Sequence, residues 1–155
     1  MQDTISRLRA KKDDEGFTLI ELLVVVVIIG VLVAIAVPVY LNYRKGAADK
    51  SAQSDVRGAI SAIEQYYTEN SNAYPAAFAG VATASIPLGT SSQRITLSDK
   101  TTMTFVPVPA TGAATSYLLC ATNSGGSGKV YLYDSSAGGS VRVPTTAVKI
   151  ATCAP

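Results

Sequence analysis

The feature that most constrains this chain is an apolar run near its amino terminus, from Phe17 to Leu41, which contains a single charged residue, Glu21. As a helix, these 25 residues would be longer than the roughly 30 Å hydrocarbon core of a bilayer. The run is rich in valine and isoleucine, which favour strands in water. A single segment in lipid, however, must satisfy its backbone hydrogen bonds internally. We therefore expect residues 17–41 to form a membrane-spanning helix.

The apolar run passes without a helix stop into an amphipathic segment, residues 42–70. Its apolar positions recur at spacings of three and four, at Ala48, Ala52, Val56, Ile60, Ile63 and Tyr67. Charged residues occupy its remaining surface, namely Lys45, Asp49, Lys50, Asp55, Arg57 and Glu64. Asn and Ser cluster near Asn70, and Pro75 forbids continuation. The two segments are expected to form one helix of about 50 residues.

The rest of the chain has the character of short strands. Residues 71–94 are rich in Ala, Gly, Ser and Pro and are expected to form a loop. Strand-like runs follow at residues 95–98, 102–108, 117–122, 130–133 and 141–143. The short connections indicate antiparallel hairpins. We expect an α+β fold in which the second half of the helix packs on a small antiparallel sheet within residues 95–155.

Cys120 and Cys153 are the two cysteines of the chain, and they do not form a metal-type C-x-x-C pair. An even number in a chain with an export-like amino terminus favours one disulfide, formed outside the cytoplasm. Two reduced, buried thiols are the alternative. A disulfide would fasten the carboxy-terminal edge of the sheet and stabilise the fold by about 3–4 kcal/mol.

Little in the sequence indicates catalysis. The chain has no histidine, so the commonest general base and the commonest zinc ligand are both absent. The stretch from Ser124 to Lys129 lacks the four-residue spacer of a phosphate-binding loop, and a hairpin turn explains it better. Calcium at residues 134–139 would have one acid, which is too few for a site. We expect no catalytic residue, cofactor or metal, and the net charge of +2 predicts no specific nucleic acid partner.

Two ordinary interpretations of the apolar run are a secretory signal peptide cut after Ala36 and a plain membrane anchor. The polar leader is half acidic, and the run exceeds the usual apolar region of a signal peptide. Neither interpretation explains a carboxylate at Glu21.

The stretch EGFTLIELLVVVVIIGVLVAIAVPVYLNYR resembles the amino terminus of a type IV prepilin, the precursor of pili and of the pseudopilins of related secretion systems. The match includes Gly16, Phe17, Glu21, Gly30 and Pro38, and it is strong over residues 15–45. The resemblance implies a cleaved leader, residues 1–16. A prepilin peptidase would cut after Gly16 and methylate the new Phe17 amine, and a glycine lets a protease approach the backbone closely.

The resemblance also implies a role for Glu21 in subunit register. In family filaments, this glutamate neutralises the amino terminus, here Phe17, of a neighbouring subunit. A charge within the membrane costs about 2.5–3.5 kcal/mol, and a wrong stagger would leave both charges unpaired. The alternative is a glutamate near the membrane edge that reaches the lipid head groups.

Gly30 and Pro38 are both weak helix formers, and Pro38 cannot donate a hydrogen bond to Ala34. They bracket a segment that could stretch when subunits pack, as in related proteins. A simple kink in a membrane helix is the alternative.

These observations favour a structural subunit, a pilin of an extracellular type IV pilus. The second hypothesis is a pseudopilin or minor pilin of a type II secretion or DNA-uptake fibre, and an enzyme is the third. The implied partners are a prepilin peptidase, identical subunits in a helical filament, an assembly ATPase and a membrane platform. The precursor would cross the cytoplasmic membrane once before it enters the extracellular filament.

Overall fold

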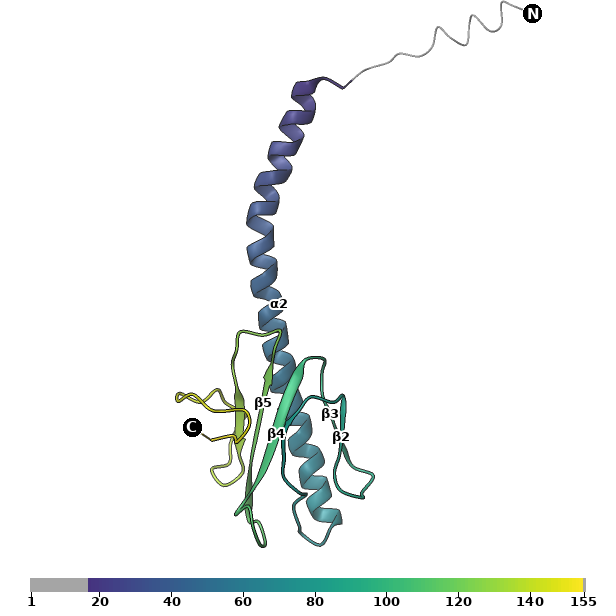
Figure 1. Cartoon of the computed structure of the whole chain (residues 1–155), viewed down its shortest axis with the longest axis vertical. Helices are drawn as coiled ribbons and strands as arrows, with labels where there is room; N and C mark the ends of the chain where they lie inside the picture. Colours follow the sequence, from purple (N-terminus) through teal and green to yellow (C-terminus); the bar gives the residue numbers. More distant parts are fainter. Residues whose placement is uncertain (1–16, 155) are drawn as a thin grey trace, which may run out of the picture. The chain divides into compact units, whose positions relative to one another are not determined.

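The computed structural model of the chain describes residues 17–154 (Figure 1). Over this range, one long helix precedes a set of short strands. The elements are α2 (Leu19–Glu69), β1 (Phe78–Val81), β2 (Ser85–Pro87), β3 (Arg94–Thr96), β4 (Thr101–Val108), β5 (Ser116–Asn123) and β6 (Tyr131–Asp134). The chain divides into two compact units between Tyr40 and Leu41.

The amino-terminal unit contains the apolar half of α2. Every described residue from Phe17 to Tyr40 is exposed, including the valines, leucines and isoleucines on all sides of the helix. Within the described residues, α2 is the one helix long and apolar enough to cross a membrane. An all-round apolar helix is stable only when lipid or protein covers it.

The globular unit contains a four-stranded antiparallel sheet in the order β1-β4-β5-β6, and β2 pairs with β3 in a separate hairpin. β4 and β5 pair over their full length, from Thr101 opposite Asn123 to Val108 opposite Ser116. β6 continues the meander beside β5. The predicted α+β fold, a long helix followed by a small antiparallel sheet, is confirmed.

The strands differ from the prediction at both ends of the sheet region. Residues 71–94, expected as a loop, contain β1 and β2. β1 is held by pairing with β4, where the rings of Phe78 and Phe105 stack with centroids 5.7 Å apart. Residues 141–143 form only an isolated bridge, between Arg142 and Leu132. Segments of three or four residues are too short for an alternating pattern to reveal, because their conformation depends on the neighbouring strand.

The core lies between one face of the sheet and the second half of α2. Four helix residues are completely buried, namely Ala52, Val56, Ala59 and Ile63. They pack with inward-facing residues of β4 and β5, which include Met103, Phe105, Tyr117, Leu119 and Ala121. Figure 1 shows β4 and β5 running alongside this part of the helix. The spacing of four, three and four places the helix residues on one face, as the amphipathic pattern predicts.

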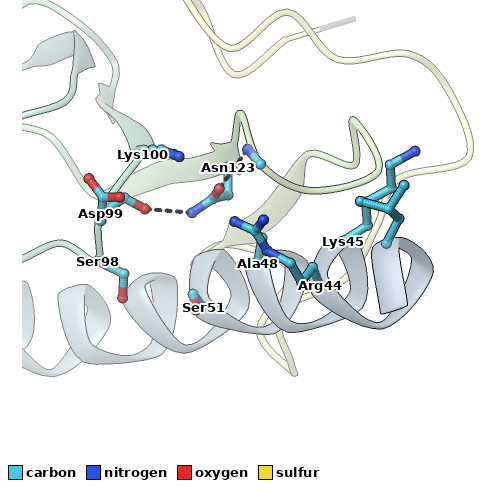
Figure 2. A pocket seen from close by; sticks show the side chains of 10 residues that line it. Arg44, Lys45, Ala48, Ser51, Ser98, Asp99, Lys100 and Asn123 are labelled. Atoms are coloured by element: carbon cyan, nitrogen blue, oxygen red, sulfur yellow. Dashed lines mark hydrogen bonds between the residues drawn. The ribbon is translucent and has the colours of Figure 1, made fainter. Parts of the chain in front are cut away.

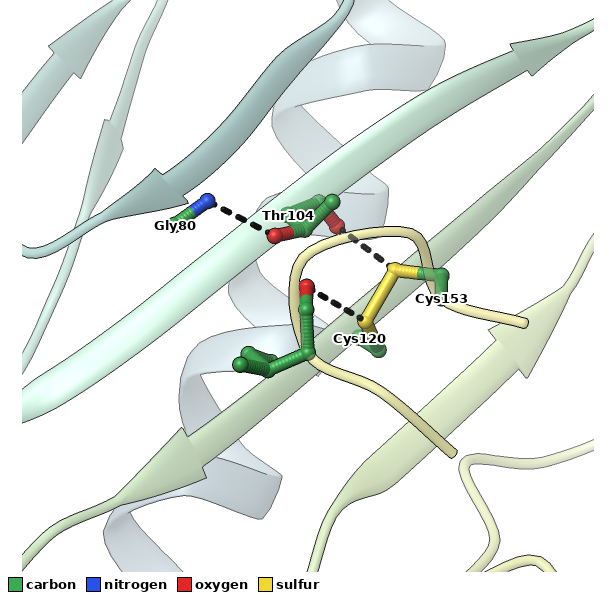
Figure 3. Close-up of a disulfide and its surroundings, with 5 residues drawn as sticks. Gly80, Thr104, Cys120 and Cys153 are labelled. Carbon is green, nitrogen blue, oxygen red and sulfur yellow. Dashed lines mark hydrogen bonds between the residues drawn. A yellow bond between two sulfur atoms is a disulfide. The ribbon is translucent and has the colours of Figure 1, made fainter. Parts of the chain in front are cut away.

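The opposite face of the sheet is covered by the carboxy-terminal segment. Cys120 on β5 and Cys153 form a disulfide with a Cα–Cα distance of 5.6 Å (Figure 3). The Cys153 sulfur lies 3.3 Å from the carbonyl oxygen of Thr104 on β4. The sequence analysis predicted that the disulfide fastens the carboxy-terminal edge of the sheet, and this was wrong. Because β5 is an interior strand, the disulfide holds the carboxy-terminal segment against the outer face of the sheet.

Candidate processing and assembly site

Helix α2 begins with a capping box formed by Thr18 and Glu21. The Thr18 backbone amide and its hydroxyl both donate hydrogen bonds to Glu21 Oε2, at 2.9 Å and 2.8 Å. The Glu21 backbone amide donates in return to Thr18 Oγ1 at 3.3 Å. The two side chains therefore satisfy amide donors that a helix start leaves without intrahelical partners. The carboxylate that the apolar run makes costly is thus bound locally at the first turn.

The predicted cleavage site lies at the border of the described chain. Gly16 and the leader, residues 1–16, lie outside the described residues. Phe17, whose amine is predicted to be methylated, precedes the helix and is 87% exposed. Phe17 also lines a shallow apolar pocket with Ile20, Glu21 and Val24. The predicted processing and register residues thus lie within five positions of one another.

Gly30 and Pro38 both lie inside α2, which is continuous through them. A side chain built at Gly30 would meet no atom within 4 Å, so nothing in the described chain requires a glycine there. The missing donor of Pro38 does not end the helix. Gly30 and Pro38, the two weakest helix formers of the apolar run, thus do not interrupt the helix.

Asp49 and Asp55 connect the helix to two loops of the globular unit. The Ser127 backbone amide donates to Asp49 Oδ1 at 2.9 Å, and the Ser127 hydroxyl donates to the other oxygen. Asp55 accepts from the Ser98 amide and hydroxyl in the same way, each at 2.9 Å. The sequence placed both acids on the charged surface of the helix, and this was wrong. They are only 5% and 9% exposed, because loops distant in sequence cover them.

Two further polar groups stabilise the sheet. The buried Tyr117 hydroxyl donates to Glu64 Oε1 at 2.8 Å. Burial, and then the hydrogen bond to Glu64, raises the pKa of Tyr117 well above its usual value. Asp134 accepts hydrogen bonds from Ser136 and Ala137 within its own turn. These bonds, that of the Ser136 side chain first, lower the pKa of Asp134.

A known family model matches the segment that contains the start of α2. Residues 11–37 match the model described as the prokaryotic N-terminal methylation motif. The chain carries a prokaryotic methylation motif. The matched range includes Gly16, Phe17 and the capping box, and the resemblance to type IV prepilins is thereby confirmed.

The relatives are both pilins and secretion proteins. The chain is 42% identical over 73 residues to a fimbrial protein of Neisseria meningitidis, covering 46% of this chain and 42% of the relative. It is 38% identical over 68 residues to type II secretion system core protein G of Escherichia coli, covering 44% and 46%. It is 43% identical over 53 residues to the type IV major pilin protein PilE1 of Neisseria gonorrhoeae, covering 34% and 32%. The chain thus matches less than half the length of each.

Thr18 is the residue of this site that the sequence analysis missed. The pattern Thr18-Leu19-Ile20-Glu21 is the S/T-x-x-E signature of a capping box, so the signal was present. It was overlooked because Glu21 was treated as a charge in lipid and not also as the third residue of a helix.

Proposed function

We propose that this protein is a pilin, a structural subunit of an extracellular type IV pilus. A prepilin peptidase would remove residues 1–16, methylate the Phe17 amine and release a subunit that polymerises through residues 17–41. The observation that carries the proposal is the methylation motif on a helix that is apolar and exposed on all sides. Such a helix is stable only in a membrane or among its copies, and a filament precursor uses both in turn.

The other proposed segments follow from this role. Residues 42–70 would join the filament core to the globular unit, residues 71–94 would lead from the helix into the sheet through β1 and β2, and residues 95–155 would form the rest of the sheet and the disulfide-closed region. The protein would act without catalysis or a cofactor. Its proposed partners are identical subunits, the peptidase, an assembly ATPase and a membrane platform. The precursor would reside in the cytoplasmic membrane.

In this proposal, Glu21 sets the axial register of the subunits. Methylation leaves the Phe17 amine basic, and the carboxylate of a neighbouring subunit would neutralise it within the apolar filament core. Gly30 and Pro38 would let the intervening turns stretch on packing, because both residues favour helix less than their neighbours do.

A pseudopilin of a type II secretion fibre is the second candidate. The similarity to core protein G of Escherichia coli supports this candidate. Its identity and coverage are close to those of the match to the fimbrial protein. The two functions share processing and polymerisation and differ in the length of the fibre. Electron microscopy of cells that express the chain at its natural level distinguishes long surface fibres from none.

The deciding measurement is the intact mass of the protein in a fraction sheared from the cell surface. We expect a mass that begins at Phe17 and carries one additional methyl group. A mass that begins at Val37 would indicate removal of an ordinary signal peptide and would exclude the filament role. Cells that hold only the uncut chain would indicate a plain membrane anchor.

A further inference from the structure

A basic pocket lies on the globular unit, beside the residues with which the apolar run ends. It has a volume of about 400 Å³ and is lined by the second half of α2, by the turn at residues 98–100 and by the start of the loop after β5. Three of its residues are basic, namely Arg44, Lys45 and Lys100, and one is acidic, Asp99. Figure 2 shows the Arg44 side chain reaching from the helix toward the turn, while the Asp99 carboxylate points away from the helix. The pocket therefore presents positive charge from two separate segments.

Lys100 is held in this pocket by an ordered turn. Its backbone φ is +63°, a conformation that residues with a side chain rarely adopt. The turn is fixed on several sides: the Ser124 amide donates to the Lys100 carbonyl at 3.1 Å, and Asn123 Nδ2 donates to the Asp99 carbonyl at 2.9 Å. Ser98, at its start, is bound by Asp55. Strain of this kind persists only where surrounding contacts impose it, and it commonly marks a functional position.

The lysines of the pocket are not neutralised within the described chain. Over residues 17–154, neither Lys45 nor Lys100 forms a salt bridge or a side-chain hydrogen bond, and both are exposed. By contrast, Lys129 lies 3.8 Å from Asp49, and Lys50 donates to Gln53. The excess charge of the pocket thus fits an anion from outside the chain.

The position of Arg44 and Lys45 along α2 favours an anion of the membrane surface. Arg44 and Lys45 follow the last apolar residue, Leu41, by three and four positions on the same continuous helix. At 1.5 Å per residue, their backbone lies about 4.5–6 Å beyond the apolar run, which would be the head-group layer of a bilayer that the run spans. Bases at this end of the run also oppose the usual bias of positive charge toward the cytoplasm. An anionic group in the facing leaflet would compensate for this placement.

We propose that this pocket binds the phosphate of an anionic phospholipid while the precursor crosses the membrane. The inference rests on the proposed function, because it requires the helix to be inserted before assembly. Lys45, from the helix, and Lys100, from the turn, would attract the phosphate. The bound lipid would hold the globular unit at the membrane surface until the subunit is extracted into the filament.

The test uses the full chain, purified in a neutral detergent and titrated with short-chain phosphatidylglycerol, phosphatidylcholine or sodium phosphate, with the bound species counted by native mass spectrometry. We expect phosphatidylglycerol to bind preferentially. The double variant Lys45→Gln/Lys100→Gln should weaken that binding about thirtyfold, since each base near a membrane surface contributes about 1 kcal/mol. The matched control, Lys50→Gln/Lys149→Gln, loses the same charge outside the pocket and should bind as the natural chain does.

Three results would overturn the proposal: equal weakening in both double variants, sodium phosphate binding as tightly as the lipid, or no preference for phosphatidylglycerol over phosphatidylcholine. Because a change at Lys100 alters a strained turn, the single variant Lys45→Gln provides a second measurement. It lies on the helix and should weaken lipid binding about fivefold. Lipid binding is measured on the isolated chain and processing on sheared filaments, so either proposal can fail while the other holds.

Discussion

The Thr18 backbone amide donates a hydrogen bond of 2.9 Å to Glu21 Oε2, so the charged residue of the apolar run is also the cap of its own helix. A carboxylate bound in this way has two available roles, to stabilise the first turn and to neutralise the amine of a neighbouring subunit. The two roles make different demands on the side chain. Capping needs an acceptor, which glutamine also supplies, whereas neutralisation needs a negative charge.

Glu21→Gln therefore separates the two roles. We expect this variant to keep the capping box and be processed at Gly16, but to yield at least tenfold less sheared filament, because the Phe17 amine stays unpaired in an apolar core. Filament yield and the amino-terminal mass of the retained subunit measure the effect.

Thr18→Ala is the matched control, because it removes the hydroxyl partner of Glu21 and keeps the charge. It should cost about 1 kcal/mol of helix stability and reduce assembly only modestly. Normal assembly of Glu21→Gln would show that register does not depend on the charge, and an equal loss in both variants would assign the effect to the cap.

The disulfide should account for a large share of the stability of the globular unit. It closes a loop with a sequence separation of 33, which corresponds to about 3–4 kcal/mol in the chain-entropy model. Cys120→Ala/Cys153→Ala should lower the free energy of unfolding by this amount, as measured by urea denaturation of the full chain in detergent micelles. Reductant should destabilise the natural chain similarly and leave the double variant unchanged. A variant as stable as the natural chain would mean that packing alone holds the carboxy-terminal segment.

The sequence predicted the features that depend on a local pattern. It did not predict the features that depend on contacts between segments distant in the chain. The long helix follows from one apolar run and one period of three and four, both continuous in sequence. Asp49 and Asp55 belong to the same helix, yet their burial depends on Ser127 and Ser98, which lie 78 and 43 positions away. No pattern within residues 42–70 marks these two acids among the other charged residues. The position of Cys120 on an interior strand likewise required the strand order.

Gly126 should be needed to bring Ser127 to Asp49. A methyl group at Gly126 would overlap Asp49 Oδ1, the oxygen that accepts from the Ser127 amide. Gly126→Ala should therefore lower the free energy of unfolding by about 1–3 kcal/mol, the range for leaving a buried polar group without its partner. Urea denaturation measures the change.

Gly58→Ala is the control for that substitution. Gly58 lies in the interior of α2, and a methyl group there would meet no atom within 4 Å. It should stabilise the chain by about 0.5–1 kcal/mol, because alanine favours helix more than glycine does. If Gly126→Ala changed the free energy of unfolding as Gly58→Ala does, the loop would adjust without losing the contact with Asp49.

Alkaline pH should destabilise the globular unit through Tyr117. Burial and the hydrogen bond to Glu64 raise the pKa of Tyr117 in the folded chain, and burial also raises the pKa of Tyr74 and Tyr131. In the unfolded chain, tyrosines lose their protons near pH 10. Above that pH the folded state binds more protons than the unfolded state, so the free energy of unfolding falls as pH rises, while below it the stabilisation is fully present.

Tyr117→Phe should make the unfolding free energy less dependent on pH in the alkaline range. At pH 7 the variant should lose about 1 kcal/mol, because the hydrogen bond to Glu64 is gone. Above pH 10 its unfolding free energy should decline less steeply than that of the natural chain, since one of the groups that must ionise on unfolding is absent. Urea denaturation at intervals between pH 7 and pH 11 measures both slopes, and Tyr43→Phe, at a residue 76% exposed, should leave the profile unchanged. Parallel profiles for the natural chain and Tyr117→Phe would mean that another group governs alkaline unfolding.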